Sequence, residues 1–336
     1  MARTTTETTR DVVGIGNAII DILAHADEAF LGKHALTKGA MNLVDDAFAS
    51  RLYESMPPAV EASGGSCANT MAGVASFGGK AGYIGKVRDD DFGRIFRHDI
   101  RAIGVDFETA PSRDGAPTAR SLILITPDAQ RTMHTYLGAC VELGPDDVDP
   151  AFVQSAQITY LEGYLWDPPA AKQALLKAAE AAHAARRKVS LTLSDPFCVE
   201  RHRDSFRDLI AGHIDVLFAN EAEILSLYRV KDFADAVAAV RLDCTVAALT
   251  RSEKGSVVVA GDTVIELAAE PIEHLVDTTG AGDQYAAGFL FGYARGRPLA
   301  ECGRLGGLAA AEVIGHLGPR PDRPLSDLLA AVEDAG

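Results

Sequence analysis

Short apolar runs and helically spaced apolar positions follow one another along most of this chain. The runs predict strands at residues 11–16, 39–46, 81–87, 158–161, 189–193, 216–219, 246–249 and 256–259. Apolar residues three and four positions apart predict helices at residues 63–77, 91–103, 170–187, 199–211, 222–228, 233–239, 284–294 and 305–314. Strands that alternate with helices form mostly parallel sheets, because the connecting helices pack on the sheet faces. The pattern therefore predicts a doubly wound α/β fold with helices on both faces of a mostly parallel sheet.

Two stretches interrupt this alternation, at about residues 17–45 and 107–136. The second predicts two strands, 119–125 and 132–137, on either side of a Pro-Asp turn. We expect both stretches to form a small β-sheet lid on one large nucleotide-binding domain spanning residues 11–336. Residues 1–10 are polar and rich in threonine, which predicts a flexible tail.

Charge and cysteine content narrow the class of protein. The 336 residues carry a net charge of −15, which argues against nucleic-acid or anionic-membrane partners, because both need basic patches. No run of 18 apolar residues predicts a membrane span. The five cysteines are widely spaced without a CxxC pair, which favours a reducing, cytoplasmic setting. We expect small-molecule partners, and a monomer or a homodimer.

The most informative string is DTTGAGD, Asp277–Asp283, directly before an apolar helical run. Gly280, Ala281 and Gly282 lack bulky side chains, so their backbone N–H groups can face an anion at the positive end of the helix dipole. Asp283 falls in the first turn, where a carboxylate can accept a proton from an attacking hydroxyl. The plainer alternative is a glycine-rich turn before an acidic helix start.

This string, with the small residues at 286–288, resembles the C-terminal signature of the PfkB, or ribokinase-like, carbohydrate and nucleoside kinases. Four further strings follow the family order over about residues 11–320: Gly14–Asp21, Ser63–Thr70, Asn220–Glu223 and Thr250–Gly255. The resemblance is greatest to adenosine kinases. It implies transfer of the γ-phosphoryl group of ATP to the 5′-hydroxyl of adenosine, with Asp283 as base and residues 280–282 as the anion hole. A sugar kinase for ribose, fructose or 2-keto-3-deoxygluconate is the alternative.

On the acceptor side, the resemblance implies that Asn17 and Asp21 bind the ribose hydroxyls. It also implies that the glycine-rich string lines the acceptor pocket through Gly64, Gly65, Ser66 and Asn69. Ser66 is similar to the residue of adenosine kinases, since sugar kinases often have small apolar residues or proline there. A dinucleotide fingerprint at Gly14 is the rival interpretation, but Ile19 replaces its third glycine.

On the nucleotide side, the resemblance implies that Asn220, Thr250 and Gly255 contact ATP. Glu223 would organise waters around Mg²⁺, which takes few protein ligands. A helix N-cap is the plainer explanation of the Asn-x-x-Glu string. A K⁺ site at Asp277 and Thr279 is a further possibility that the resemblance raises.

Three more side chains have two interpretations each. Arg131 either folds over the phosphates or is a solvated hairpin residue. Tyr164 and Trp166, near the end of a strand, either stack on a purine or belong to the core. A Walker A loop does not occur in the sequence, so a P-loop kinase is excluded by pattern.

Overall fold

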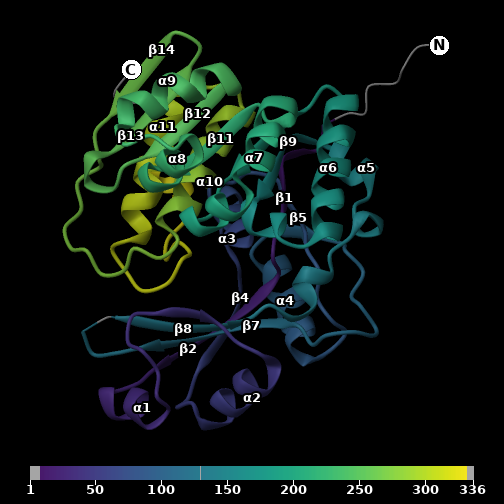
Figure 1. Cartoon of the computed structure of the whole chain (residues 1–336), viewed down its shortest axis with the longest axis vertical. Coiled ribbons are helices and arrows are strands. Elements are labelled where there is room, and N and C mark those ends of the chain that lie inside the picture. Colours follow the sequence, from purple (N-terminus) through teal and green to yellow (C-terminus); the bar gives the residue numbers. More distant parts are fainter. Residues whose placement is uncertain (1–7, 129, 331–336) are drawn as a thin grey trace.

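The computed structural model describes residues 8–128 and 130–330, which fold into a large α/β body with a small sheet beneath it (Figure 1). Within these ranges nine strands form the large sheet, in the order β14-β13-β12-β11-β10-β9-β1-β5-β6. They are β1 Arg10–Ile15, β5 Ala81–Ile84, β6 Val105–Phe107, β9 Ala156–Glu162, β10 Lys188–Thr192, β11 Val216–Asn220, β12 Val246–Thr250, β13 Ser256–Ala260 and β14 Thr263–Leu267. From β6 to β12 all neighbours are parallel, while β13 and β14 pair antiparallel. The predicted doubly wound, mostly parallel sheet is confirmed.

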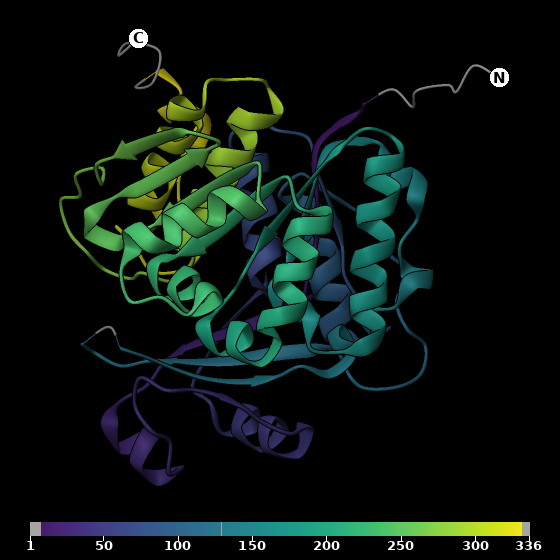
Figure 2. The ribbon, with the colours of Figure 1, turned by 45° about the horizontal axis from the view of Figure 1, so that its top comes forward.

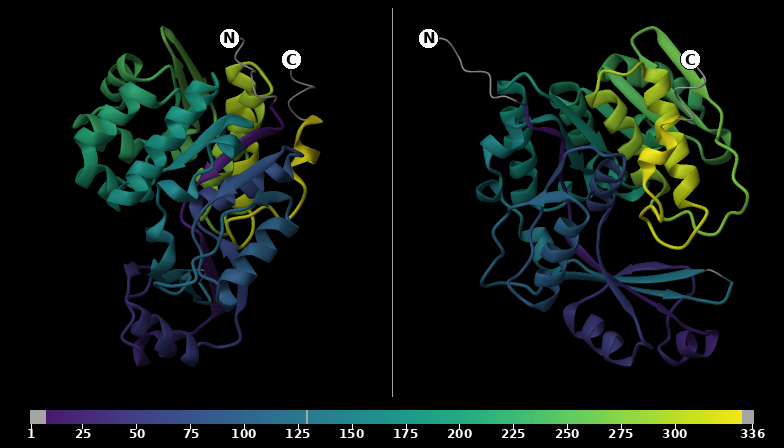
Figure 3. Two further views of the ribbon diagram at one scale, coloured as in Figure 1. Left: turned by 90° about the vertical axis from the view of Figure 1, so that its right-hand side faces the viewer. Right: turned by 180° about the vertical axis from the view of Figure 1, so that it is seen from behind.

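Helices cover both faces of the large sheet (Figure 3). One layer consists of α3 Ser66–Ser76, α4 Asp91–Ala102, α10 Ala281–Ala294 and α11 Leu299–Val313. The opposite layer consists of α5 Pro150–Gln154, α6 Pro169–Ala184, α7 Pro196–His213, α8 Glu221–Tyr228 and α9 Phe233–Asp243. Successive strand residues point to opposite faces of the sheet. Val12 therefore packs against the layer that contains α3 and α10, and Val13 packs against the layer that contains α6 and α7. Both faces of each central strand are therefore apolar.

The small sheet has the order β3-β8-β7-β2-β4. Its strands are β2 Ile19–His25, β3 Met41–Leu43, β4 Val60–Gly64, β7 Ala119–Ile125 and β8 Arg131–Tyr136. The helices α1 Glu28–Lys33 and α2 Asp46–Ser55 lie on the side away from the large body (Figure 2). Arg120 of β7 marks this outer face, because it donates to Asp46 and Ser50 of α2. The other face of the small sheet points toward the large sheet.

Several local expectations differ from the structure. Ile19–His25 is a strand, so the helix that a dinucleotide fingerprint requires does not form there. The helix expected at 63–77 begins at Ser66, because residues 60–64 pair with β2 as an edge strand. This strand, β4, lies outside the insertions predicted at 17–45 and 107–136, which contain β2, β3, β7 and β8.

The predicted tail, residues 1–10, falls mostly outside the described residues, which begin at residue 8, and Arg10 starts β1. Within the described ranges, no helix is both long and apolar enough to span a bilayer.

Candidate active site

The sequence strings meet at the carboxyl ends of the parallel strands, where open α/β sheets bind ligands. A hollow of about 220 Å³ lies there. It is lined by Ser66, Thr192, Ser194, Phe218, Ala219, Asn220, Glu223, Ala248, Thr250, Gly280, Gly282, Asp283 and Tyr285. Residues from four of the five strings, far apart in sequence, thus border one cavity.

The start of α10 faces this hollow. Gly280 is its N-cap and has φ of +79°, in the left-handed region that favours glycine. A Cβ added there would lie 2.6 Å from the backbone of Pro319, so a larger residue does not fit. A Cβ added at Gly282 would meet nothing within 4 Å, so open space lies in front of the helix start. Ala281 N donates to the Thr278 carbonyl at 3.2 Å, whereas Gly280 and Gly282 line the hollow, so the start of α10 borders a space that suits an anion.

Asp283 lies in the first turn of α10 and is held by two donors from α3. Ser66 Oγ donates to one carboxylate oxygen at 2.6 Å, and Asn69 Nδ2 donates to the other at 3.2 Å. Burial raises the pKa of Asp283 to about 6, although both hydrogen bonds lower it. At neutral pH this carboxylate is ionised and more basic than an ordinary aspartate.

The acceptor strings lie against one another between the two sheets. A Cβ on Gly64 would come within 2.2 Å of the Asp21 carboxylate, and one on Gly65 within 2.2 Å of the Asn17 carbonyl oxygen. Burial raises the pKa of Asp21 to about 6, Arg320 and Arg131 lower it, and Asp283 adds like charge. Asp21 and Asp283 therefore share one buried region.

Arg131 of β8 and Asp277, in the loop before α10, connect the small sheet to the large body. Their buried side chains, 7% and 6% exposed, form an ion pair. The Asp277 carboxylate also accepts from Thr279 N at 3.0 Å, Thr279 Oγ1 at 2.8 Å and Gly318 N at 3.1 Å. These donors and the guanidinium already satisfy the carboxylate that was expected to hold K⁺, so this arrangement does not fit that cation.

The Asn-x-x-Glu string forms a capping box at the start of α8. Asn220 N donates to Glu223 at 2.9 Å and Asn220 Nδ2 at 2.7 Å, while Glu223 N donates to Asn220 Oδ1 at 2.9 Å. Burial raises the pKa of Glu223 to about 7, the Asn220 N–H lowers it, and nearby Asp195 raises it further. The string is thus a cap and also brings a buried carboxylate to the hollow.

Thr250, at the end of β12, lines the hollow. Gly255 does not, since it turns the chain from β12 into β13 with φ of +83°. A Cβ there would lie 2.0 Å from the carbonyl oxygen of Leu267, so packing of the turn explains this glycine.

Comparison with known proteins agrees with this geometry. The model of the family described as "pfkB family carbohydrate kinase" matches residues 52–325. The chain belongs to the PfkB family. An ATP-dependent ribose-1-phosphate kinase from Halopiger xanaduensis is 31% identical, over 81% of this chain and 86% of that relative.

Two solved structures share half of the sequence. The adenosine kinase of Sinorhizobium meliloti is 54% identical with a TM-score of 0.89, over 98% of this chain and 100% of that one. A probable sugar kinase from Rhizobium etli CFN 42 is 52% identical with a TM-score of 0.89, over 98% and 99%. This PfkB chain is therefore an ATP-using kinase of a sugar or a nucleoside.

The two aromatic candidates of this PfkB chain lie in different surroundings. Trp166 is buried in the core, stacked on Phe206, and its indole N–H donates to Ser205 at 2.5 Å. Trp166 therefore belongs to the core, the second of its two interpretations. Tyr164 is half-buried, and its backbone N–H donates to Ser194 Oγ, which lines the hollow, at 3.2 Å.

Two residues of the site were missed by sequence reasoning. Glu162, at the end of β9, accepts from Asn17 Nδ2 at 2.8 Å and from Cys67 N at 3.0 Å, and burial raises its pKa to about 7. Arg320 reaches Asn69 from beyond α11. Glu162 could have been predicted, because a carboxylate at the end of a buried strand and directly before a glycine often faces a ligand site. Arg320 could not, because a single arginine between two prolines has no such pattern.

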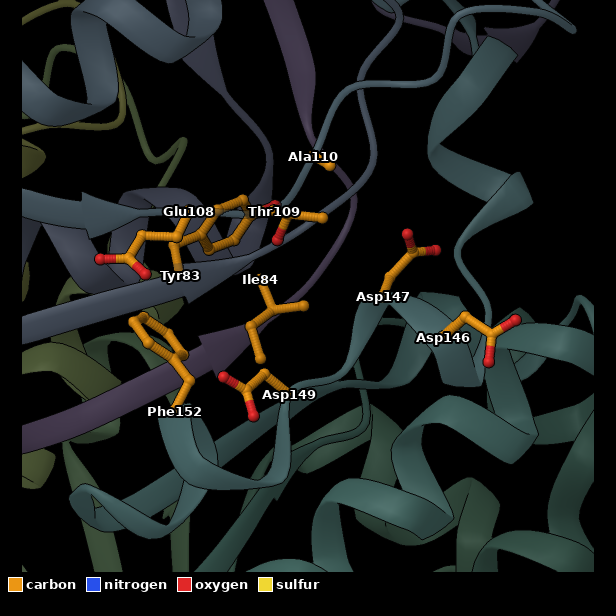
Figure 4. A pocket seen from close by; sticks show the side chains of 9 residues that line it. All are labelled: Tyr83, Ile84, Glu108, Thr109, Ala110, Asp146, Asp147, Asp149 and Phe152. Carbon is orange, nitrogen blue, oxygen red and sulfur yellow. The ribbon is translucent and has the colours of Figure 1, made fainter.

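A second hollow, of about 210 Å³, lies by β5 and β6 and shares no lining residue with the first (Figure 4). Glu108, Asp146, Asp147 and Asp149 are on its rim, and Asp147 pairs with Lys86. Across the described part of the chain, no three Asp, Glu, His or Cys side chains come together as a metal site would require. Any Mg²⁺ at Glu223 would therefore depend mainly on phosphate oxygens and water.

Proposed function

We propose that this protein phosphorylates the 5′-hydroxyl of adenosine with MgATP. The observation that carries the choice of a nucleoside is an apolar row on the inner face of the small sheet. Paired strand residues share a face, and register places five apolar residues side by side: Val60, Leu23, Ile123, Met133 and Met41.

Asp21 lies on the same face as this apolar row. It comes two residues before Leu23 in β2, a distance of about 7 Å along the strand. Val60 and Met41 are 68% and 52% exposed, so the row is not fully covered by protein. A flat purine has apolar faces that such a row can cover, whereas a free sugar presents hydroxyls on every side. The choice rests on this row, because the adenosine kinase and the probable sugar kinase compared above are almost equally similar to this chain.

The proposed chemistry begins with the acceptor. Asp21 accepts hydrogen bonds from the ribose diol, and Asn17 presents Oδ1, which has no hydrogen-bond partner among the described residues. Ser66 and Asn69 hold the Asp283 carboxylate, which takes the proton of the 5′-hydroxyl. Holding the diol and the base in fixed positions is positioning catalysis.

The start of α10 then receives the transferring phosphoryl group. The N–H groups of Gly280 and Gly282 face its oxygens and stabilise charge that spreads over them in the transition state, while the Ala281 N–H donates to the Thr278 carbonyl. Asn220 and Thr250 contact the nucleotide, and Arg131 adds positive charge near the phosphates. Glu223 is buried beside the hollow, where its carboxylate can face Mg²⁺ through water. The metal, when bound, neutralises phosphate charge.

The small sheet acts in this proposal as a lid on the large domain. The Arg131–Asp277 ion pair holds its inner face against the site. A closed lid excludes water, which limits hydrolysis of ATP without an acceptor.

A panel of acceptors tests this function through ADP release from MgATP. The panel consists of adenosine, inosine, ribose, ribose 1-phosphate, fructose and 2-keto-3-deoxygluconate. We expect adenosine to give a kcat/KM at least about 100-fold above any sugar, about 2.7 kcal/mol of discrimination. Turnover of a sugar alone would retain the kinase chemistry and replace the acceptor. No turnover on the whole panel would contradict the proposal.

A further inference from the structure

Arg320 lies in the segment 315–323, which follows α11 and returns to the site. Two neighbours in this segment contact the start of α10 and its approach: Gly318 N donates to Asp277, and the Pro319 carbonyl accepts from Gln284 Nε2 at 2.9 Å. The Arg320 side chain, 18% exposed, points on toward α3 and α4. None of the strings that resemble the family includes this residue.

The contacts of Arg320 form a chain that leads to Asp283. Arg320 Nε donates to Asn69 Oδ1 at 3.2 Å, and Asn69 Nδ2 donates to Asp283 at 3.2 Å. At its far end the guanidinium donates to Asp99 of α4 at 3.3 Å, and Asp99 also accepts from Ser63 N of β4 at 2.7 Å. The arginine is thus anchored on one side and meets Asn69 on the other.

The direction of these hydrogen bonds follows from chemistry. A guanidinium has donors and no acceptor, so Asn69 must turn its oxygen toward Arg320 and its NH₂ toward Asp283. The Asp283 carboxylate also selects the NH₂ end, because it can only accept, but without Arg320 the amide loses the donor that holds its oxygen and could rotate away from the carboxylate. We propose that Arg320 is a positioning residue: it orients the Asn69 amide so that Asp283 is held as an ionised base.

Several titratable groups face Asp283 and remain in every Arg320 variant. They are Asp21 of β2, Glu162 and Tyr160 of β9, and Cys67 of α3. Arg320 also lowers the pKa of Asp21, which interacts with Asp283 as a like charge, so Arg320→Met is compared with Arg320→Lys, which keeps that positive charge. The inference rests on the proposed role of Asp283 as base, and it is independent of which acceptor is used.

The test uses Arg320→Met, with Arg323→Met as matched control, because Arg323 is in the same segment and its side chain is 61% exposed. We expect kcat to fall ~10–100-fold at pH 6 and less at pH 8, since the loss of a donor raises the pKa of Asp283 and protonates the base. The loss should nearly vanish in an Asn69→Ala background, because the arginine acts through Asn69. Arg320→Lys, which keeps charge without the planar fork, should recover part of the activity.

A carboxyl ¹³C titration of Asp283 in the free protein, assigned with Asp283→Asn, gives a readout that needs no turnover. We expect a higher midpoint in Arg320→Met, or in Arg320→Lys if the methionine variant does not fold. An unchanged midpoint in the Arg320 variant that folds overturns the inference. A kcat loss that is equal at all pH values, or unchanged in the Asn69→Ala background, also overturns it. If none of the acceptors gives ADP release but the Asp283 titration midpoint still rises in the Arg320 variant, the proposed function is rejected and this inference remains supported.

Discussion

Arg131 of the small sheet and Asp277, in the loop before α10 of the large body, form a buried ion pair. The two residues are far apart in sequence and come from different layers of the molecule. Arg131 pairs with Ile125 within the small sheet, and Asp277 accepts hydrogen bonds from Thr279 and Gly318 of the large body. The pair therefore brings a guanidinium from the small sheet to the anion-binding start of α10, where Asp277 balances its charge.

Replacing this arginine should weaken ATP binding and turnover, and it should also destabilise the fold, because Asp277 is left buried without its partner. In Arg131→Met we expect KM for ATP to rise ~10-fold and kcat to fall ~10–100-fold, because a charge that stabilises the phosphoryl group is gone. Steady-state kinetics at saturating acceptor measure both. Arg113→Met, at an exposed position in the loop before β7, is the control and should match the parent protein. Parent-like kinetics in Arg131→Met would remove this residue from the site.

The same ion pair leads to a prediction about K⁺. Because Arg131 already provides positive charge at Asp277, turnover should change less than about two-fold when K⁺ is replaced by tetramethylammonium. In Arg131→Met the Asp277 charge is unmatched, so K⁺ should then stimulate turnover. Strong K⁺ dependence of the parent protein would show that a cation binds nearby in spite of the pair.

Asp283→Asn separates chemistry from binding. We expect kcat to fall ~10²–10⁴-fold with little change in acceptor affinity, because the amide cannot accept the proton. The free energy of unfolding at pH 8 should rise by about 1–3 kcal/mol. The folded-state pKa of about 6 lies above the ordinary 3.8, so ionisation destabilises the fold increasingly as pH rises through this window.

Denaturant titrations at pH 8 and pH 4 would measure this gain, which should disappear at the lower pH. Asp262→Asn, at a fully exposed side chain, is the matched control for both readouts. Normal turnover in Asp283→Asn would exclude the base role.

The pH profile should reflect several raised carboxyl pKa values. Asp283 and Asp21 titrate near 6 and Glu162 near 7, all because of burial. We expect kcat/KM to fall as pH drops from 7 to below 6, with a log slope steeper than one, because these groups take up protons together. A single ionisation near 4 would contradict the buried, coupled arrangement.

The apolar row can be tested by its effect on selectivity. Leu23→Ser should lower kcat/KM for adenosine ~10-fold and leave that for ribose nearly unchanged, because only the nucleoside has a base to cover. Leu242→Ser on α9, where the side chain is 87% exposed, is the matched control. Equal losses for both acceptors in Leu23→Ser would show that the row does not select the base.

The alternating pattern predicted the parallel sheet and its two helical layers, since each central strand must be apolar on both faces. It missed β4, Val60–Gly64, whose sequence VEASG has no apolar run because its first three side chains stay at least partly exposed. For the same reason the predicted helix at 63–77 began three residues early.

Local sequence alone determined the parts of the site that depend on backbone conformation. Glycine at 65 and 280 specifies left-handed turns, and Asp283 three residues later specifies a carboxylate in the first helical turn. Only the tertiary structure decided which side chains meet there. Glu162 reaches Asn17 across 145 positions and Arg320 reaches Asn69 across 251. Such contacts follow from strand order and packing, because burial strengthens a hydrogen bond or ion pair only once the fold has excluded water from it.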